Sequence, residues 1–521
     1  MKPLPVGRAA AACLALFVCL SFSCAPKTRV EAGPVPADEL EKNLSEAQAQ
    51  FNRGCYVGFK KAVEIYERLY GQRTAKRRVA YPYVRALLLK LIREREVGIL
   101  NHACYQKGIQ VIKENPPLKT FESYFEIAES LSPRTRGIMQ DISVVVVKQI
   151  YDEVLKKTQA DLQSKALADD YHAYVYAAFF TGYALYAEKK DPFAVEILAR
   201  YPESVLLKYK NAIYPEENPG RLQALLQAEP DFLEANYNLG ELALRSGELL
   251  EAEKNFLKAL DGLPESPQVT IYLASIYTAT EEFDKGLDFF ERTLALSPEY
   301  RDALLGKAIC LSSLGKYVEA VGTLNRIVEL GFYMLGESHY WLAWNYHELK
   351  DNDEAQAHIE ESKGRLPTNS EVFGLAGTIA LEKGQLDRAE KEYLEALRYN
   401  GRNTEALFNL GRLYGQRERW PESAKYFETA AFVFEQNEQA FAAKIAEIKA
   451  SSLSEERKTK LSAKKEQQLK AAQAAKANAF YNAGASYLNS GSKAKALEMA
   501  TRAADHPQFK ERADDLIKKI R

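Results

Sequence analysis

The sequence holds few of the residues that mark fibrous, disordered or nucleic-acid-binding proteins. It has 28 Gly and 20 Pro among 521 residues, too few for a fibrous or disordered chain of this length. Its 70 Lys and Arg nearly balance 71 Asp and Glu, so it lacks the basic surplus of a general nucleic-acid binder. Composition therefore leaves three or four ordinary globular domains or one long repeat array.

Cysteine is also scarce, with six in the chain, three near the start and three widely spaced: Cys13, Cys19, Cys24, Cys55, Cys104 and Cys310. This arrangement has neither a zinc-binding spacing nor a disulfide framework. We expect the last three to be isolated packing residues, and one bridge between Cys55 and Cys104 is the alternative.

Sequence motifs of catalysis are missing as well. The chain has no phosphate-binding loop, no G-x-S-x-G elbow and no G-x-G-x-x-G turn. His347-Glu348 lacks the second His that a helical zinc site requires. The sequence thus predicts a protein that is not an enzyme and that needs no metal or cofactor.

The first residues have the pattern of an export signal. Lys2 and Arg8 precede an apolar run over 9–20, which is followed by Ser21-Phe22-Ser23-Cys24. A charged start, about a dozen apolar residues and a small residue before the cut are typical of such signals. The run is shorter than the roughly 20 apolar residues of a membrane span.

The end of this segment resembles the lipobox of bacterial lipoproteins, in which the cysteine thiol is acylated. The resemblance implies a signal peptide over 1–23, a lipid anchor on Cys24 that holds the protein to a bilayer, and a flexible tether over 24–42. Cleavage without lipidation and an uncleaved anchor are the alternatives. The resemblance favours the outer membrane or a periplasmic face of the cell envelope, and surface exposure stays open.

A period of 34 residues runs through the second half of the chain, with one residue inserted near Leu335. Each of the six copies over 231–437 carries one small residue in its first half and a second small residue 12 positions further on. The first set is Gly240, Ala274, Ala308, Ala343, Gly377 and Gly411, and the second is Ala252, Gly286, Ala320, Ala355, Ala389 and Ser423. Large residues such as Phe256, Phe290 and Phe427 follow the second set.

These copies resemble the tetratricopeptide repeat (TPR), a pair of helices A and B. The small residues are expected where the two helices cross, and the large ones between neighbouring repeats. Pro264, Pro298 and Pro367 fall where helix B should end, because proline cannot continue a helix. The resemblance implies an all-α, right-handed superhelix, an α-solenoid in which each hairpin buries its apolar face against its neighbours.

The remaining segments fit this reading less regularly. Residues 43–230 are expected to form a degenerate helical repeat domain, in which the β-branched run Val144–Val147 could be a short strand but fits a buried helix better. Residues 438–476 read as a basic, Ala/Lys-rich helical insert, either solvated or in contact with anionic lipid or an acidic partner. Residues 477–521 resemble a further repeat with a C-terminal cap.

In TPR proteins the exposed positions of helix A line a concave groove that binds peptides. Carried over by register, the groove candidates of this sequence are Tyr237, Arg245, Tyr340, Trp344, His347, Phe408 and Arg412. Tyr340 and Trp344 lie four residues apart, hence on one helix face, and we expect the Trp344 region to be the main contact. The alternative is that both residues only pack within their own repeat.

The sequence therefore predicts a membrane-anchored TPR scaffold that binds a protein or peptide partner in the bacterial cell envelope, and no nucleic acid. The alternatives are an accessory subunit of a small-molecule uptake system, with a transport-system binding protein as partner, and a surface-exposed attachment protein.

Overall fold

The computed structural model describes residues 36–99, 101–130, parts of 152–163, 169–187, 192–214, 216–331 and 334–521. Every regular element in these ranges is a helix, and the predicted all-α solenoid is confirmed. The chain divides into two compact units, one of residues 1–96 and 101–218, the other of residues 97–100 and 219–521. Cys24 and the run Val144–Val147 lie outside the described residues.

The N-terminal unit is a set of closely packed helices around one large apolar core. Its described helices are α1 (Ala37–Asn52), α2 (Tyr56–Tyr70), α3 (Lys76–Glu96), α4 (Ala103–Glu114), the 3₁₀ helix η1 (Pro116–Phe121), α5 (Glu122–Ser130), α7 (Asp170–Ala187), α8 (Pro192–Ala199) and α9 (Val205–Ile213). Helix α3 ends inside the unit, where the guanidinium of the buried Arg93 stacks on Tyr209 at 4.0 Å. Cys55 and Cys104 are buried free thiols.

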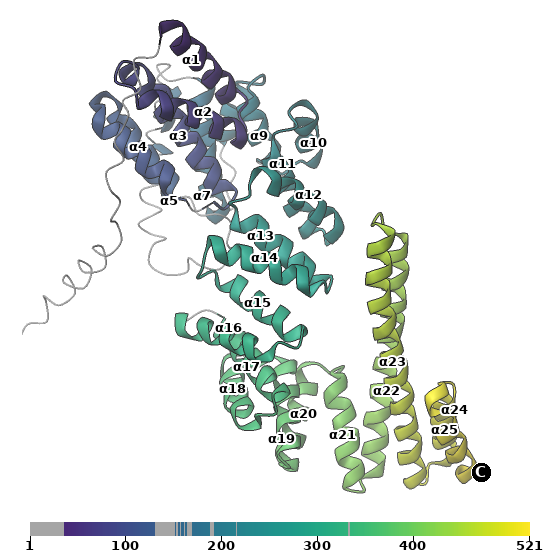
Figure 1. Ribbon diagram of the computed structural model, residues 1–521. Helices are drawn as coiled ribbons and strands as arrows, with labels where there is room; N and C mark the ends of the chain where they lie inside the picture. Colours follow the sequence, from purple (N-terminus) through teal and green to yellow (C-terminus); the bar gives the residue numbers. More distant parts are fainter. Residues whose placement is uncertain are drawn as a thin grey trace, which may run out of the picture. The chain divides into compact units, whose positions relative to one another are not determined.

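The second unit starts with α10 (Pro219–Ala228) and continues as stacked hairpins (Figure 1). Repeats 1 to 6 are α11 (Leu233–Arg245) with α12 (Leu249–Gly262), α13 (Pro267–Ala279) with α14 (Phe283–Leu296), α15 (Arg301–Ser313) with α16 (Tyr317–Leu330), α17 (Leu335–Glu348) with α18 (Asn352–Arg365), α19 (Ser370–Glu382) with α20 (Leu386–Tyr399), and α21 (Thr404–Gln416) with α22 (Trp420–Ala450). Helices α23 (Glu455–Asn489), α24 (Lys493–Ala504) and α25 (Pro507–Ile520) follow.

The small residues of the period lie where the helices of a hairpin approach each other. A Cβ added to Gly240 would lie 2.8 Å from the ring of Phe256, and one added to Gly411 would lie 2.8 Å from the ring of Phe427. Such distances are well inside van der Waals contact, so these positions accept little beyond glycine. The prediction that small residues sit at helix crossings is confirmed here by geometry.

The turn between helix A and helix B repeats one backbone feature. One residue in each turn has a positive φ, and these residues are Gly247, Glu281, Gly315, Lys350, Gly384 and Glu418 in repeats 1 to 6. Glycine adopts this left-handed conformation without the steric cost that a side chain adds. The spacing of 34 residues, with 35 between the third and fourth turns, matches the period of the sequence.

Candidate binding groove

Helix α17 carries three of the predicted groove residues. The indole of Trp344 is half-buried, and its ring contacts Tyr317 of the preceding repeat at 5.7 Å and Trp341 at 5.8 Å, both edge-on. Tyr340 contacts Trp341 in the same way at 5.5 Å. These rings therefore hold one another in place and still present part of their surface, as aromatic anchors of binding sites do.

Two carboxylates lie near the phenol of Tyr340. Burial, and then the charges of Glu371 and Glu405, raise the pKa of Tyr340 to about 12. Both glutamates are the second residues of their helices, α19 and α21, where the positive end of a helix favours an acidic side chain. The fold thus brings residues of repeats 4, 5 and 6 together in one acidic region.

This region borders a pocket of about 360 Å³, lined among others by Glu371, Arg402, Asn403, Glu405 and Asn437. The amide of Asn403 donates to Glu371 at 3.4 Å. Burial, and then the neighbouring Glu405, raises the pKa of Glu371. A carboxylate whose pKa is raised by burial and by a second carboxylate is stabilised by a cationic ligand.

His347 is buried and lies 3.1 Å from Glu382, Nε2 to Oε1. Burial raises the pKa of Glu382, but the hydrogen bond from Asn352 and the contact with His347 outweigh it and lower the pKa. This pair joins repeats 4 and 5, so His347 has a structural contact of its own at the edge of the acidic region.

Phe408 and Arg412 lie on α21. Phe408 is half-buried, with its ring edge-on to Phe427 at 5.2 Å. Arg412 is exposed and lines a second hollow of about 360 Å³ with residues of α22 and α23, among them Trp420 and Asn482. Of the predicted pair, Arg412 therefore borders this hollow, and Phe408 packs on Phe427, which also lines it.

The first repeat is different. Tyr237 is buried, with its hydroxyl donating to Glu241 at 3.2 Å and its ring edge-on to Phe256. Arg245 is exposed at the end of α11. Both residues belong to repeat 1, three repeats before α17, which carries Tyr340 and Trp344.

The sequence analysis missed the acidic side of the groove. The second residue of helix A is acidic in four of the six repeats, namely Glu234, Asp302, Glu371 and Glu405, and Glu337 is the third residue of α17; this regularity was available as a signal. In the part of the chain that the structure describes, no group of three or more His, Cys, Asp or Glu residues is placed to bind a metal ion. No helix of the described residues is both long and apolar enough to cross a membrane.

Family comparisons agree with this geometry. Family models described as tetratricopeptide repeat match residues 220–267, 277–331, 336–365 and 375–440. The chain is a tetratricopeptide repeat protein. The four matched ranges lie between α10 and the middle of α22 and leave residues 268–276 and 366–374, which include most of α13 and the start of α19, unmatched.

Curated relatives share parts of this TPR array. Protein O-mannosyl-transferase TMTC1 of Homo sapiens is 26% identical over 200 residues, 38% of this chain and 22% of that protein. BBSome complex member BBS4 of Bos taurus is 32% identical over 168 residues, 31% of each chain. The chain thus spans less than a third of the length of these relatives, and the part shared with the transferases is their TPR region.

Solved structures are similar to this chain at low sequence identity. The pilF structure of Pseudomonas aeruginosa is 20% identical and covers 41% of this chain and 97% of that chain, with a TM-score of 0.36. The Cut9 complex with Hcn1 is 12% identical and covers 93% of this chain and 96% of that chain, with a TM-score of 0.39. Nothing about partners or activity follows from scores this low.

Proposed function

We propose that this TPR protein is a scaffold that binds an extended peptide segment of a partner protein across repeats 4 to 6. The observation that carries the proposal is the half-buried aromatic pair Tyr340 and Trp344 beside the carboxylates Glu371 and Glu405. Aromatic anchors next to polar groups are typical of interface cores. The raised pKa of Glu371 favours a partner segment with Lys or Arg next to an apolar residue.

We further propose that the scaffold acts in the bacterial cell envelope, held to a membrane by acylated Cys24. The support is the sequence pattern of residues 1–24 alone. Mass spectrometry of the mature N-terminus tests it: we expect a diacylated cysteine, and Cys24→Ala should release the protein from the membrane fraction. An unmodified N-terminus, or unchanged fractionation of the variant, would reject the anchor and leave the binding proposal standing.

A peptide array tests the groove. Synthetic 12-residue peptides would carry one aromatic residue and two Lys, with Glu in place of Lys in the matched set. We expect the purified protein to bind the Lys set, and Trp344→Ala with Phe408→Ala to weaken binding about 10- to 100-fold, as the loss of one or two interface anchors does.

The matched control is Tyr399→Ala, which removes a partly exposed aromatic side chain from helix B of repeat 5. It should leave binding unchanged. Glu371→Gln with Glu405→Gln should abolish the preference for Lys over Glu. Equal binding by all variants would show that the groove of repeats 4 to 6 is not the site.

A further inference from the structure

A long helical hairpin interrupts the repeat pattern after repeat 6. Helix α22 has 31 residues and α23 has 35, against 13 or 14 for each helix of repeats 1 to 5. At 1.5 Å per residue α23 is about 50 Å long. Residues 438–476, here called the arm, extend past the hairpins of the neighbouring repeats and turn at Ser451–Ser454 (Figure 1).

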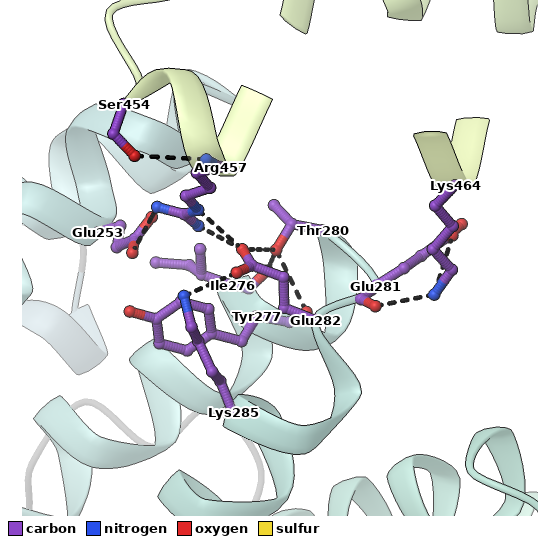
Figure 2. A network of polar contacts seen from close by, with 10 residues as sticks. All are labelled: Glu253, Ile276, Tyr277, Thr280, Glu281, Glu282, Lys285, Ser454, Arg457 and Lys464. Atoms are coloured by element: carbon purple, nitrogen blue, oxygen red, sulfur yellow. Dashed lines mark hydrogen bonds and ion pairs between the residues drawn. The ribbon is translucent and has the colours of Figure 1, made fainter. Parts of the chain in front are cut away.

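The outer part of the arm meets the first two repeats through Arg457. Its Nη1 lies 2.9 and 2.8 Å from the two carboxylate oxygens of Glu253 on α12, and its Nε lies 3.1 Å from Glu282 at the start of α14 (Figure 2). The partners are 204 and 175 residues away in sequence. The side chains of Glu253 and Glu282 are only 6% and 2% exposed, and that of Arg457 is 16% exposed, so one half-buried guanidinium lies between two shielded anions.

A second group of contacts lies further along α23. Lys464 donates to the backbone carbonyl of Glu281 at 2.8 Å, and Lys465 to its carboxylate at 2.8 Å. Gln468 donates to the other carboxylate oxygen at 3.0 Å. Because Arg457, Lys464 and Gln468 are spaced by 7 and 11 residues, they lie on one face of the helix. This face of α23 therefore presents basic and amide groups at the spacing needed to reach Glu281 and Glu282 in the A–B turn of repeat 2.

Glu281 has a left-handed backbone, with φ of 61°, as do Lys350 and Glu418 at the same turn position of repeats 4 and 6, whereas glycine holds this position in repeats 1, 3 and 5. A side chain at this position carries strain. Burial raises the pKa of Glu281, but the bonds from Lys465 and Gln468 outweigh it and lower the pKa. The carboxylate that occupies the glycine position thus serves as a ligand for the arm.

We propose that the arm is an electrostatic strap that joins the end of the TPR array to helix B of repeat 1 and to the A–B turn of repeat 2. The docked strap sets the separation between the first and last repeats and, through it, the width of the groove over the repeats between them. A rise in ionic strength weakens the more exposed part of this contact, the pair of Lys464 with Glu281, and screens the shielded pairs of Arg457 less. Release of the strap lets the two ends of the array move apart and widens the groove.

Cross-linking within the full-length protein tests the strap. A photoreactive amino acid replaces Ser452, an exposed residue of the turn of the arm, and mass spectrometry measures its cross-links to residues 246–285. We expect a defined cross-link at low salt that weakens in 1 M NaCl. Arg457→Glu should lower the equilibrium constant for docking of the arm at least about tenfold, because breaking a pair of shielded charges costs more than about 1.4 kcal/mol, and the cross-link yield should fall with the docked fraction.

Matched variants separate the strap from a general disturbance. Lys444→Glu reverses a charge on the same arm whose ion pair is with Glu447 of its own helix, and it should keep the cross-link. Arg457→Glu combined with Glu253→Arg should restore part of it. Glu281→Gly should lower the yield while relieving the strained turn.

The strap proposal would be wrong if Arg457→Glu gave the wild-type cross-link yield. It would also be wrong if the double variant Arg457→Glu with Glu253→Arg did not restore part of a lost cross-link. Circular dichroism of each variant shows that the helices are intact. The readout involves no partner, so it stands or fails independently of the peptide-binding proposal.

Discussion

Two glycines inside helices of repeat 3 should respond in opposite directions to the same substitution. Gly306 lies in α15, and a Cβ there would meet the ring of Phe290 at 2.1 Å. Gly322 lies in α16, and a Cβ there would meet nothing within 4 Å. Alanine in a helix is favoured over glycine by about 0.5–1 kcal/mol, so Gly322→Ala should stabilise the protein by that amount.

For Gly306→Ala the gain from the higher helix propensity of alanine is opposed by overpacking, which costs about 1–3 kcal/mol in a filled core. Phe290 is only 3% exposed, so its ring has little room to move aside. We expect a net loss of about 1–2 kcal/mol. Replacing Phe290 with Leu in the Gly306→Ala background should recover part of it by making space for the new methyl group.

Urea unfolding followed by circular dichroism measures both variants. We compare urea midpoints only between variants whose unfolding free energies have the same slope with urea concentration, because an array of repeats need not unfold in two states. The midpoint should rise for Gly322→Ala and fall for Gly306→Ala. If both midpoints rise equally, the tight crossing at Gly306 is not as the structure places it, and the packing reason for small residues in this array fails.

Two further predictions concern titratable groups. His339 and His358 stack with Nδ1 atoms 3.0 Å apart, and burial lowers the pKa of both, helped for His339 by the charge of His358. The folded state then binds fewer protons than the unfolded state, so stability should fall as the pH drops below about 6.5. Urea midpoints at pH 7.5 and 5.5 should differ less in His358→Gln than in wild type, and an equal drop would contradict the assignment. Burial raises the pKa of Cys104 to about 12, so native protein should resist iodoacetamide at this thiol, as intact-mass measurements would show; rapid alkylation at pH 8 would refute its burial.

The sequence alone was enough to predict the helical array. Its evidence is local: small residues recur every 34 positions because each hairpin repeats the same crossing, as at Gly240 and Gly411. Prolines mark the ends of helix B for the same reason, since Pro298 follows α14, which ends at Leu296. A period can be read from residues that are near one another in the chain, because each repeat packs on the next.

Two features were decided only by the tertiary structure. The acidic region joins Tyr340 to Glu371 and Glu405, three residues from three repeats, and the strap joins Arg457 to Glu253 across 204 residues. Both depend on how much each hairpin rotates relative to the last one. The 34-residue pattern specifies how one hairpin packs on the next, and the small rotation at each such contact accumulates over the whole array. Contacts between residues of distant repeats depend on the accumulated rotation, so only the three-dimensional structure shows them.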